Sequence, residues 1–423
     1  MNNVLFTGFY FDGWHGSVIH ILEIAEYLVK KGYKCYCASL SISEIQKMHA
    51  KEKGLIVCRI DELPLDVEYD IVWAYHFPLL ATLLYNGLKY KKIHVGCLSS
   101  FVPIEFLPIY YKECALCTVV SEEAKNILVD KYKVDDNFIS VYPNFLPDKF
   151  FEFKKSKSKS LQKIAVVSNH IPDEIKNLPE YLADVDIDFW GEGNEFCSLI
   201  TPDNLSQYDV VISIGKTVQY AMGMGIPVYE YDHFGGCGYI NEKNYLEEEF
   251  YNYSGRKSDR KISSKEIASE LVLGFNDALG EAVKLKTIAG DRYLLSKKVD
   301  EILRVLNAKH TTKLSCSSEN ALFMAYSRSF VDYTLSYIGV INHQKNIINK
   351  INENKIIDEM QNNEKIKELS EELIKINNEI TNLNLKNVWK KMRYPRWFVK
   401  IICCFIPKEK NRKRFRRKYT LAK

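Results

Sequence analysis

The segment Tyr208–Gly238 alternates strand-like and helix-like patterns over a short distance, and it constrains the fold more than any other part of the chain. The apolar run at 210–214 is typical of a buried strand. The next residues, Gly215-Lys216-Thr217, begin an amphipathic helix that ends at Gly225, and 228–231 is a second apolar run. This strand, helix and strand predict a parallel sheet, and ligands bind such sheets at the carboxyl ends of the strands.

The start of this helix is a candidate phosphate site. Backbone N–H groups at a helix N-terminus lack partners and carry partial positive charge, so they attract phosphate. Lys216 adds a full charge, and Thr217 adds a hydroxyl. The segment is not a P-loop, because Val210 stands where that motif needs its first glycine. The alternative is an ordinary helix with a surface lysine.

Alternating strands and helices continue over most of the chain. Residues 1–150 and 151–310 each form such a series, and the Lys/Ser-rich run 154–163 lies where they join. The prediction is an α/β fold with two Rossmann-like domains facing a cleft, which is the usual place for a ligand. Beyond them, 311–340 is expected to be a helical connector, 341–387 a coiled coil and 388–423 a basic amphipathic tail.

Three parts of the sequence resemble GT-B glycosyltransferases. The stretch 221–228 ends in Gly-x-Pro-Val and precedes a glycine-rich loop at 232–238. A Ser-Glu pair at 121–122 follows a strand, and Pro143-Asn144 leads toward the second domain. At the start of the chain, 4–31 reads as a strand, a glycine loop and a helix. The resemblance covers about the first 310 residues. It implies an N-terminal acceptor domain, a C-terminal nucleotide-sugar donor domain, and no bound metal or cofactor.

One departure from this family concerns its donor contacts. Retaining members of the family-4 type carry two glutamates eight positions apart, which grip the ribose and diphosphate. The corresponding positions here are Ile212 and Tyr220, and neither is acidic. These contacts are therefore either absent or made by other groups, with Lys216, Thr217 and the loop at Asp232 as candidates.

Candidate catalytic residues of the first domain follow its strands. His76 comes after the apolar strand 70–74, where the resemblance places a histidine beside the sugar, and imidazole can donate or accept a hydrogen bond. Alternatively, His76 bonds only to local backbone. Asp12 and His15 lie in the first glycine loop, and either they act as a base and an acceptor contact or they serve as surface polar groups. Two glycines of this acceptor loop complete the set, Gly13 and Gly16.

Candidate donor contacts cluster after strands of the second domain. Ser168-Asn169-His170 ends the first strand there, and the same loop faces the diphosphate in GT-B enzymes, although it could simply cap the next helix. The glycines after Asp232 and His233 allow close approach of a ligand or a plain turn. The predicted donor-binding set is Ser168, Asn169, His170, Gly215, Lys216, Thr217, Asp232, His233, Gly235 and Gly236.

The cysteines and the N-terminus bear on location. The chain has 11 cysteines and no charged-then-apolar leader, so we expect reduced thiols in a cytoplasm. Cys114-x-x-Cys117 is a single CxxC pair, and the sequence offers no second half of a zinc site.

Near the C-terminus, apolar residues recur at spacings of three and four. This predicts a short coiled-coil seam that pairs two copies of the chain, or else a helix packed on its own domain. The seam residues are Ile366, Leu369, Leu373, Ile376, Ile380 and Leu383.

The last segment, 388–423, has fourteen Lys/Arg and one acid, a net charge of +13. Since the whole chain carries +4, the remainder carries −9. Cations interleaved with aromatic rings suit an anionic inner-membrane surface; nucleic acid is the less favoured partner, because it would not need Trp397-Phe398. Similar basic endings occur in bacterial capsule and lipopolysaccharide transferases. The predicted membrane residues are Trp389, Trp397, Phe398, Arg412, Lys413, Arg414, Arg416 and Arg417.

Together these features favour a peripheral-membrane glycosyltransferase on the cytoplasmic side of the cell membrane. It would move a sugar from a nucleotide diphosphate donor to a lipid-linked or polysaccharide acceptor during bacterial surface glycan synthesis. Two alternatives stay open: a non-catalytic membrane-tethered scaffold that uses the coiled coil, and a sugar-nucleotide epimerase on the same two-domain fold.

Overall fold

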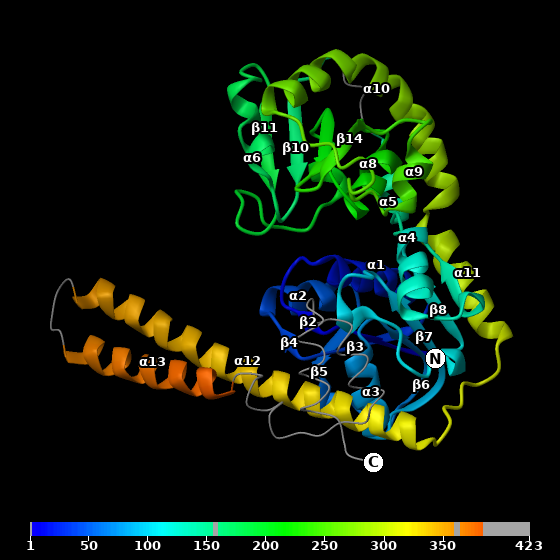
Figure 1. The fold of residues 1–423 in the computed structure, drawn as a ribbon, viewed down its shortest axis with the longest axis vertical. Coiled ribbons are helices and arrows are strands. Elements are labelled where there is room, and N and C mark those ends of the chain that lie inside the picture. The colour runs from blue at the N-terminus through cyan, green and yellow to red at the C-terminus, as the bar shows by residue number, and fades with distance from the viewer. Residues whose placement is uncertain (1, 155–159, 359–363, 384–423) are drawn as a thin grey trace. The chain divides into compact units, whose positions relative to one another are not determined.

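The computed structural model describes residues 2–154, 160–358 and 364–383. The first Rossmann-like lobe contains a seven-stranded parallel sheet in the order β5-β3-β1-β6-β7-β8-β9 (Figure 1). A two-residue pair, β2 (Tyr10–Phe11) and β4 (Ser41–Ile42), lies apart from it. The strands are β1 (Asn3–Thr7), β3 (Lys34–Ser39), β5 (Leu55–Arg59), β6 (Glu68–Ala74), β7 (Lys89–Cys97), β8 (Leu116–Val119) and β9 (Ile139–Val141).

Four helices follow strands of this sheet, as the alternation predicts. They are α1 (Gly16–Lys30), α2 (Glu44–Glu52), α3 (Phe77–Tyr85) and α4 (Glu122–Asn126). Helix α1 buries residues three or four apart, among them Val18, Ile21 and Leu28, because this spacing places them on one side. Glu23 and Glu26, both partly buried, lie on another flank of the same helix.

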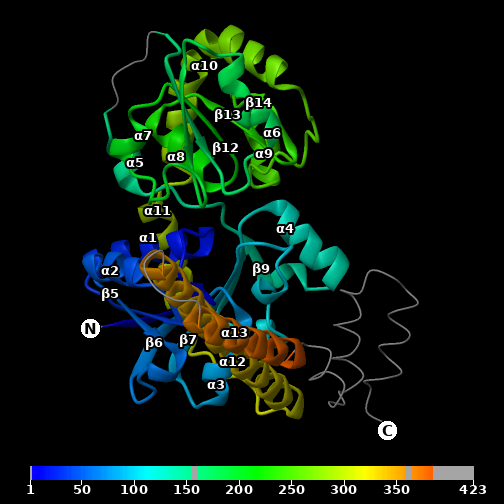
Figure 2. The ribbon, with the colours of Figure 1, turned by 90° about the vertical axis from the view of Figure 1, so that its left-hand side faces the viewer.

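The second lobe has a five-stranded sheet in the order β11-β10-β12-β13-β14 (Figure 2). Its strands are β10 (Lys163–Val167), β11 (Asp186–Trp190), β12 (Val210–Ser213), β13 (Val228–Asp232) and β14 (Gly235–Tyr239). Helices α8 and α10 pack against each other beside this sheet. The helices are α5 (Asp148–Glu152), α6 (Asp173–Lys176), α7 (Pro202–Leu205), α8 (Lys216–Met224), α9 (Tyr245–Phe250) and α10 (Ser264–Arg292).

The glycine-rich stretch 232–238 differs from the prediction. We expected an open loop, but Gly235–Tyr239 forms β14, which pairs antiparallel with β13. The β14 backbone is therefore engaged in a hairpin, with only His233 and Phe234 at its turn. Glycine is unfavourable in strands, so this pairing overrides the local preference of the sequence.

The chain crosses back to the first lobe after α10. Helix α11 (Leu295–Ala308) buries Val299, Ile302 and Leu306 in the same hydrophobic core as β1 and α1. The predicted division at 310 would group this helix with the second lobe. At the crossing, Leu146 accepts a hydrogen bond from the N–H of Leu295 at 2.8 Å and donates one to Tyr293 at 2.8 Å.

The chain divides into two compact units, 1–331 and 332–423. Helix α12 (Ser318–Asp358) runs from the first unit into the second, which also contains α13 (Glu364–Leu383). Within the second unit α12 and α13 contact each other, because Gln344 bonds to Asn377 at 2.6 Å and His343 lies 3.6 Å from Glu372. The predicted membrane residues of 388–423 lie outside the described residues. Among the described helices, none has a stretch long and apolar enough to cross a membrane.

Candidate functional site

The helix start at Gly215 sits at the carboxyl end of β12, as the sequence predicts. Gly215 has a φ of +62°, a left-handed conformation that favours glycine, and its N–H donates to the carbonyl of Tyr253 at 2.6 Å. The N–H groups of Lys216 and Thr217 belong to the first turn of α8, where no intrahelical acceptor exists. These three residues are named the phosphate turn, 215–217.

The side chain of Lys216 does not extend over the phosphate turn. Its ammonium forms an ion pair with Glu23 of α1 at 2.5 Å, and both side chains are largely buried. The Nζ atom also lies 3.4 Å from Nδ1 of His20. Burial, followed by the charge of Lys216, holds the pKa of His20 well below its ordinary value, so this imidazole is neutral.

Tyr220 occupies the position where the family-4 type carries a glutamate, and its side chain makes packing and hydrogen-bond contacts inside the protein. Its ring stacks on Phe150 with 4.2 Å between the ring centroids, and its hydroxyl donates to Glu23. A carboxylate from the first lobe thus meets both Lys216 and Tyr220. The Tyr220 side chain therefore packs between α8, α5 and α1 and does not line an open donor site.

Four of the predicted donor residues are linked by hydrogen bonds near the carboxyl ends of β10 and β13. Ser168 donates to the buried carboxylate of Asp232 at 2.9 Å and accepts the N–H of His170 at 2.9 Å. The other Asp232 oxygen accepts the N–H of His233 at 2.7 Å, and the rings of His170 and His233 lie 6.0 Å apart. Asn169 accepts the N–H of Glu192 at 2.9 Å.

Gly235 and Gly236 are required by packing of the backbone. An added Cβ at Gly236 would lie 1.8 Å from the carbonyl oxygen of Glu230, and one at Gly235 would lie 2.3 Å from that of Arg260. These glycines are therefore crowded by neighbouring chain. This crowding does not test the predicted contact of the two glycines with a ligand, which stays a prediction.

His76 and Glu105 form a buried pair in the first lobe. Nδ1 of His76 accepts the N–H of Phe9 at 3.1 Å, so it carries no proton. Nε2 lies 3.7 Å from a carboxylate oxygen of Glu105, whose other oxygen has no hydrogen-bond partner. The neutral ring therefore holds its proton on Nε2, facing Glu105.

Asp12 and His15 are about half exposed and lie 4.0 Å apart. His15 also lies 3.9 Å from Glu192, which follows β11 of the second lobe. Gly13 is next to this contact, since an added Cβ would meet Glu192 and His15, whereas Gly16 has open space at the start of α1. The glycine loop thus reaches the second lobe, but His76 belongs to a separate, buried group.

Arg256 is a candidate that sequence reasoning missed. Its guanidinium pairs with both oxygens of Glu123, near the start of α4, and lies over the rings of Phe101 at 4.7 Å and Phe234 at 5.7 Å. The Ser-Gly-Arg tripeptide at 254–256 was the available signal, but nothing in the sequence pairs it with Glu123.

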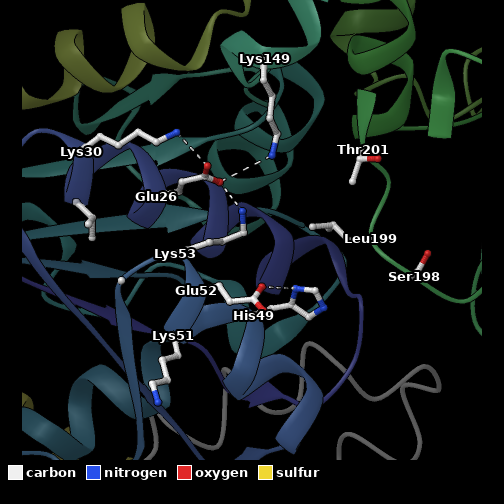
Figure 3. Close-up of a pocket in the computed structure, with 12 residues that line it drawn as sticks. Glu26, Lys30, His49, Lys51, Glu52, Lys53, Lys149, Ser198, Leu199 and Thr201 are labelled. Carbon is white, nitrogen blue, oxygen red and sulfur yellow. Dashed lines mark hydrogen bonds and ion pairs between the residues drawn. The ribbon is translucent and has the colours of Figure 1, made fainter. Parts of the chain in front are cut away.

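A pocket of about 670 Å³ lies elsewhere, around Glu26 (Figure 3). Three lysines converge on this carboxylate: Lys30 at 3.0 Å, Lys149 at 3.8 Å, and Lys53 in closest contact. Burial alone would raise the pKa of Glu26, but the hydrogen bond from Lys53 and the other cations lower it to about 2. None of the predicted site residues lines this pocket.

Among the described residues, one triad of metal-binding side chains is closely spaced: Glu230, Cys237 and Glu248. A thiol must lose its proton to bind a metal. Burial and the neighbouring glutamates raise the pKa of Cys237 far above its ordinary value, so the thiol stays protonated. The sulfur donates to the carbonyl of Gly238 at 3.7 Å and accepts from the side-chain amide of Asn244 at 3.6 Å, so the structure shows a hydrogen-bonded, neutral thiol.

Comparison with known proteins identifies the fold of this chain. No family model and no curated protein matches the chain. The structure of Anabaena HepE in complex with UDP and glucose is 14% identical, with a TM-score of 0.51 over 73% of this chain and 100% of that one. The HepE complex with UDP-glucose is 13% identical, with the same TM-score and coverage. A glycosyltransferase from Rickettsia africae is 13% identical, with a TM-score of 0.46 over 73% of this chain and 99% of that one. The arrangement of two Rossmann-like lobes in this chain is the GT-B fold.

Proposed function

We propose that this protein is a glycosyltransferase that takes its sugar from a nucleotide diphosphate donor. The observation that carries the proposal is the assembly of Ser168, His170, Asp232 and His233 at the same edge of the sheet as the phosphate turn. Such an edge of a parallel sheet is where α/β folds bind ligands. HepE, whose structures contain UDP with glucose or UDP-glucose, supports a donor of this class.

In the proposed reaction the diphosphate is the leaving group and gains negative charge as the sugar bond breaks. The first-turn amides of α8 can stabilise that charge without rearrangement. Lys216 and Arg256 supply full charges if they exchange Glu23 and Glu123 for phosphate oxygens. Guanidinium and phosphate match well, because two parallel N–H groups meet two oxygens.

In the first lobe, we assign the acceptor to the loop that holds Asp12, Gly13, His15 and Gly16. His15 faces the second lobe through Glu192, so it is placed to meet a group bound between them. Both ring nitrogens of His76 already have contacts, Nδ1 with the N–H of Phe9 and Nε2 with Glu105. His76 can therefore act on the attacking hydroxyl only if Glu105 moves away from Nε2. No metal or cofactor takes part in the proposal, and the nucleotide-sugar is a substrate.

The finer part of the proposal concerns the acceptor. The basic, aromatic segment 388–423 suits the inner face of a cell membrane, where a lipid-linked or polysaccharide acceptor of capsule or lipopolysaccharide type would be met. Pairing of two copies through the seam of α13 is a further part of the proposal; the seam residue Ile376 is buried within its own unit, and the exposed Ile374 lies outside the seam.

A donor screen tests the proposal. Full-length protein is mixed with UDP-, GDP- and CDP-sugars and bacterial membrane extract as acceptor, and release of the nucleotide is measured. We expect release with one donor class, and a loss of about 100-fold in Asp232→Asn or Ser168→Ala. Lys30→Met, in the pocket around Glu26, is the matched control and should retain full turnover. Equal release by all three variants, or none from the wild type with any donor, would contradict the proposal.

One observation favours a second candidate, a non-catalytic scaffold. Lys216 and Arg256 are both neutralised by carboxylates of the opposite lobe, as expected if they only hold the two lobes together. Calorimetry with UDP, GDP and CDP separates the two, because the scaffold binds none of them.

A further inference from the structure

Two buried carboxyl groups lie close together behind the hairpin of the second lobe. Glu230 of β13 is fully buried and Glu248 of α9 is 3% exposed. Oxygen atoms of both, and the sulfur of Cys237 in β14, lie within 4.8 Å of one another. The Oε2 atom of each glutamate lacks a hydrogen-bond partner. The proposed reaction uses neither group.

A shared proton accounts for this arrangement. Two carboxylates can only accept hydrogen bonds, so they attract each other only when one of them is protonated. Burial raises the pKa of Glu230 above its ordinary value. Burial, and then the neighbouring Glu230, raise the pKa of Glu248 to about 8. Near neutral pH, therefore, one proton stays between the two carboxyl groups, as in other buried carboxyl pairs.

The pair is joined to the phosphate turn by backbone hydrogen bonds. Oε1 of Glu230 accepts the N–H of Gly255 at 3.2 Å, and the carbonyl of Glu248 accepts the N–H of Tyr253 at 2.7 Å. The carbonyl of Tyr253 in turn accepts the N–H of Gly215 at 2.6 Å. Only one residue therefore separates the carboxyl pair from the turn that is proposed to hold phosphate.

Segment 252–256 needs such support. Asn252, Tyr253 and Gly255 have φ values of +56°, +50° and +73°, so the segment follows neither helix nor strand. An added Cβ at Gly255 would lie 2.3 Å from the carbonyl oxygen of Gly235, which leaves little room for another path. The segment ends in Arg256, three residues after Tyr253, whose carbonyl accepts the N–H of Gly215.

We infer that Glu230 and Glu248 share one proton and thereby position segment 252–256, with Arg256, against the phosphate turn. The pair is a positioning device and does not touch the substrate. The part of the inference that concerns phosphate rests on the proposed function, whereas the shared proton and the ordering of the segment do not.

The other charged groups near the pair are already engaged. Glu247 pairs with Lys257 at 3.0 Å, and Arg260 pairs with Glu270 at 2.7 Å. The buried hydroxyl of Tyr253 bonds to Tyr293 at 2.9 Å. Cys237, the remaining neighbour, is a protonated thiol. A raised carboxyl pKa near 8 belongs to the pair itself.

The sign of the pH effect follows from the raised pKa. The folded pair keeps a proton that unfolded glutamates release near their ordinary pKa of 4.5. Its contribution to the free energy of unfolding is complete below that value and is lost as the pH rises to about 8. In the folded chain the pair supports segment 252–256 until the shared proton is lost near pH 8. Above that point the affinity for UDP should fall about tenfold per pH unit, as for the loss of one proton.

The test uses the full chain and compares wild type with Glu248→Gln and Glu247→Gln. In Glu248→Gln the new amide can donate to Glu230 at every pH, whereas Glu247→Gln changes the same charge on the same helix outside the pair. Three quantities are measured from about pH 6 to about pH 9.5, a range that brackets the expected transition. They are the infrared band of protonated carboxyl, amide exchange in segment 252–256 corrected for its intrinsic rate, and UDP affinity by calorimetry.

We expect a protonated-carboxyl band that disappears near pH 8 in wild type and in Glu247→Gln, with faster exchange and weaker UDP binding. In Glu248→Gln the band is absent, and exchange and affinity stay level through that range. A wild type without the band at neutral pH, or with a bound metal ion by elemental analysis, overturns the inference, as does an unchanged pH profile in Glu248→Gln. If band and exchange behave as expected but UDP never binds, the shared proton is confirmed and the proposed donor is wrong.

Discussion

Glu23 and Glu26 lie three residues apart on α1, and both contact lysines. They differ in whether the neighbouring positive charge equals or exceeds the charge of the carboxylate. Glu23 is buried against one cation, Lys216, and the hydroxyl of Tyr220. Glu26 is partly exposed and meets three cations, which leaves an excess of positive charge. Because burial removes water, Glu23 depends wholly on its partner, whereas solvent can replace any one partner of Glu26.

The largest effect is expected from Lys216→Ala. This substitution leaves Glu23 as a buried charge without its cation, which should lower the free energy of unfolding by about 3 kcal/mol. Sugar-nucleotide turnover should fall by about 100-fold as well. Urea unfolding and nucleotide release measure the two effects.

The double variant Glu23→Gln with Lys216→Met separates the two roles of this lysine. Since neither residue is then charged, most of the lost stability should return, while turnover stays low. Recovery of both would mean that Lys216 serves structure alone.

The next effect concerns Glu26, whose pKa of about 2 lies below its ordinary value of 4.5. A lowered pKa means that the carboxylate contributes stability above pH 4.5, and this contribution is lost as the pH falls toward 2. Because the side chain is 23% exposed, we expect about 2 kcal/mol rather than the full shift.

Urea unfolding of wild type and Glu26→Gln between neutral and acid pH measures this contribution. The two curves should converge on acidification, whereas Glu52→Gln, an exposed carboxylate in the same pocket, should follow wild type. A constant gap between wild type and Glu26→Gln at every pH would contradict the assigned pKa.

A smaller effect should come from Glu123→Gln, which weakens the contact with Arg256. We expect a loss of about 1 kcal/mol in unfolding free energy, since this pair is partly exposed. If Arg256 binds diphosphate, release from Glu123 should also tighten UDP binding by about threefold, measured by calorimetry. Weaker UDP binding would show instead that the pair holds the site in its working form.

The smallest effect is expected from Lys30→Met. Lys30 is 71% exposed, and Glu26 keeps Lys53 and Lys149 when it is removed. The loss should be about 0.3 kcal/mol, typical of an exposed pair on a helix. A loss as large as that of Lys216→Ala would remove the contrast between the two carboxylates.

Most strands and the fold class could be predicted from the sequence, because buried parallel strands such as 210–213 read as uninterrupted apolar runs. The hairpin at 235–239 could not, since glycine disfavours strands and only pairing with β13 forces the conformation. Helix α10 is a single element of 29 residues, although glycine lowers helix propensity. Its only internal glycines, Gly274, Gly280 and Gly290, do not interrupt it.

The sequence could predict which candidate residues lie together only where they follow parallel strands of one sheet. Ser168 and Asp232 meet because their strands end at one edge of the sheet, which topology alone implies. Glu23, Glu123 and Arg256 were missed, since their contacts join positions more than a hundred residues apart. No periodicity within the chain encodes such pairings.

The return of α11 to the first lobe has a practical consequence for the design of shorter fragments of this protein. A fragment that stops near residue 150 lacks Val299, Ile302 and Leu306, which complete its hydrophobic core, and would expose apolar surface. A fragment that spans only 151–310 carries the same helix with nothing to cover it. Expressed separately, neither half is a natural module, and co-expression of the two is the arrangement expected to yield soluble protein.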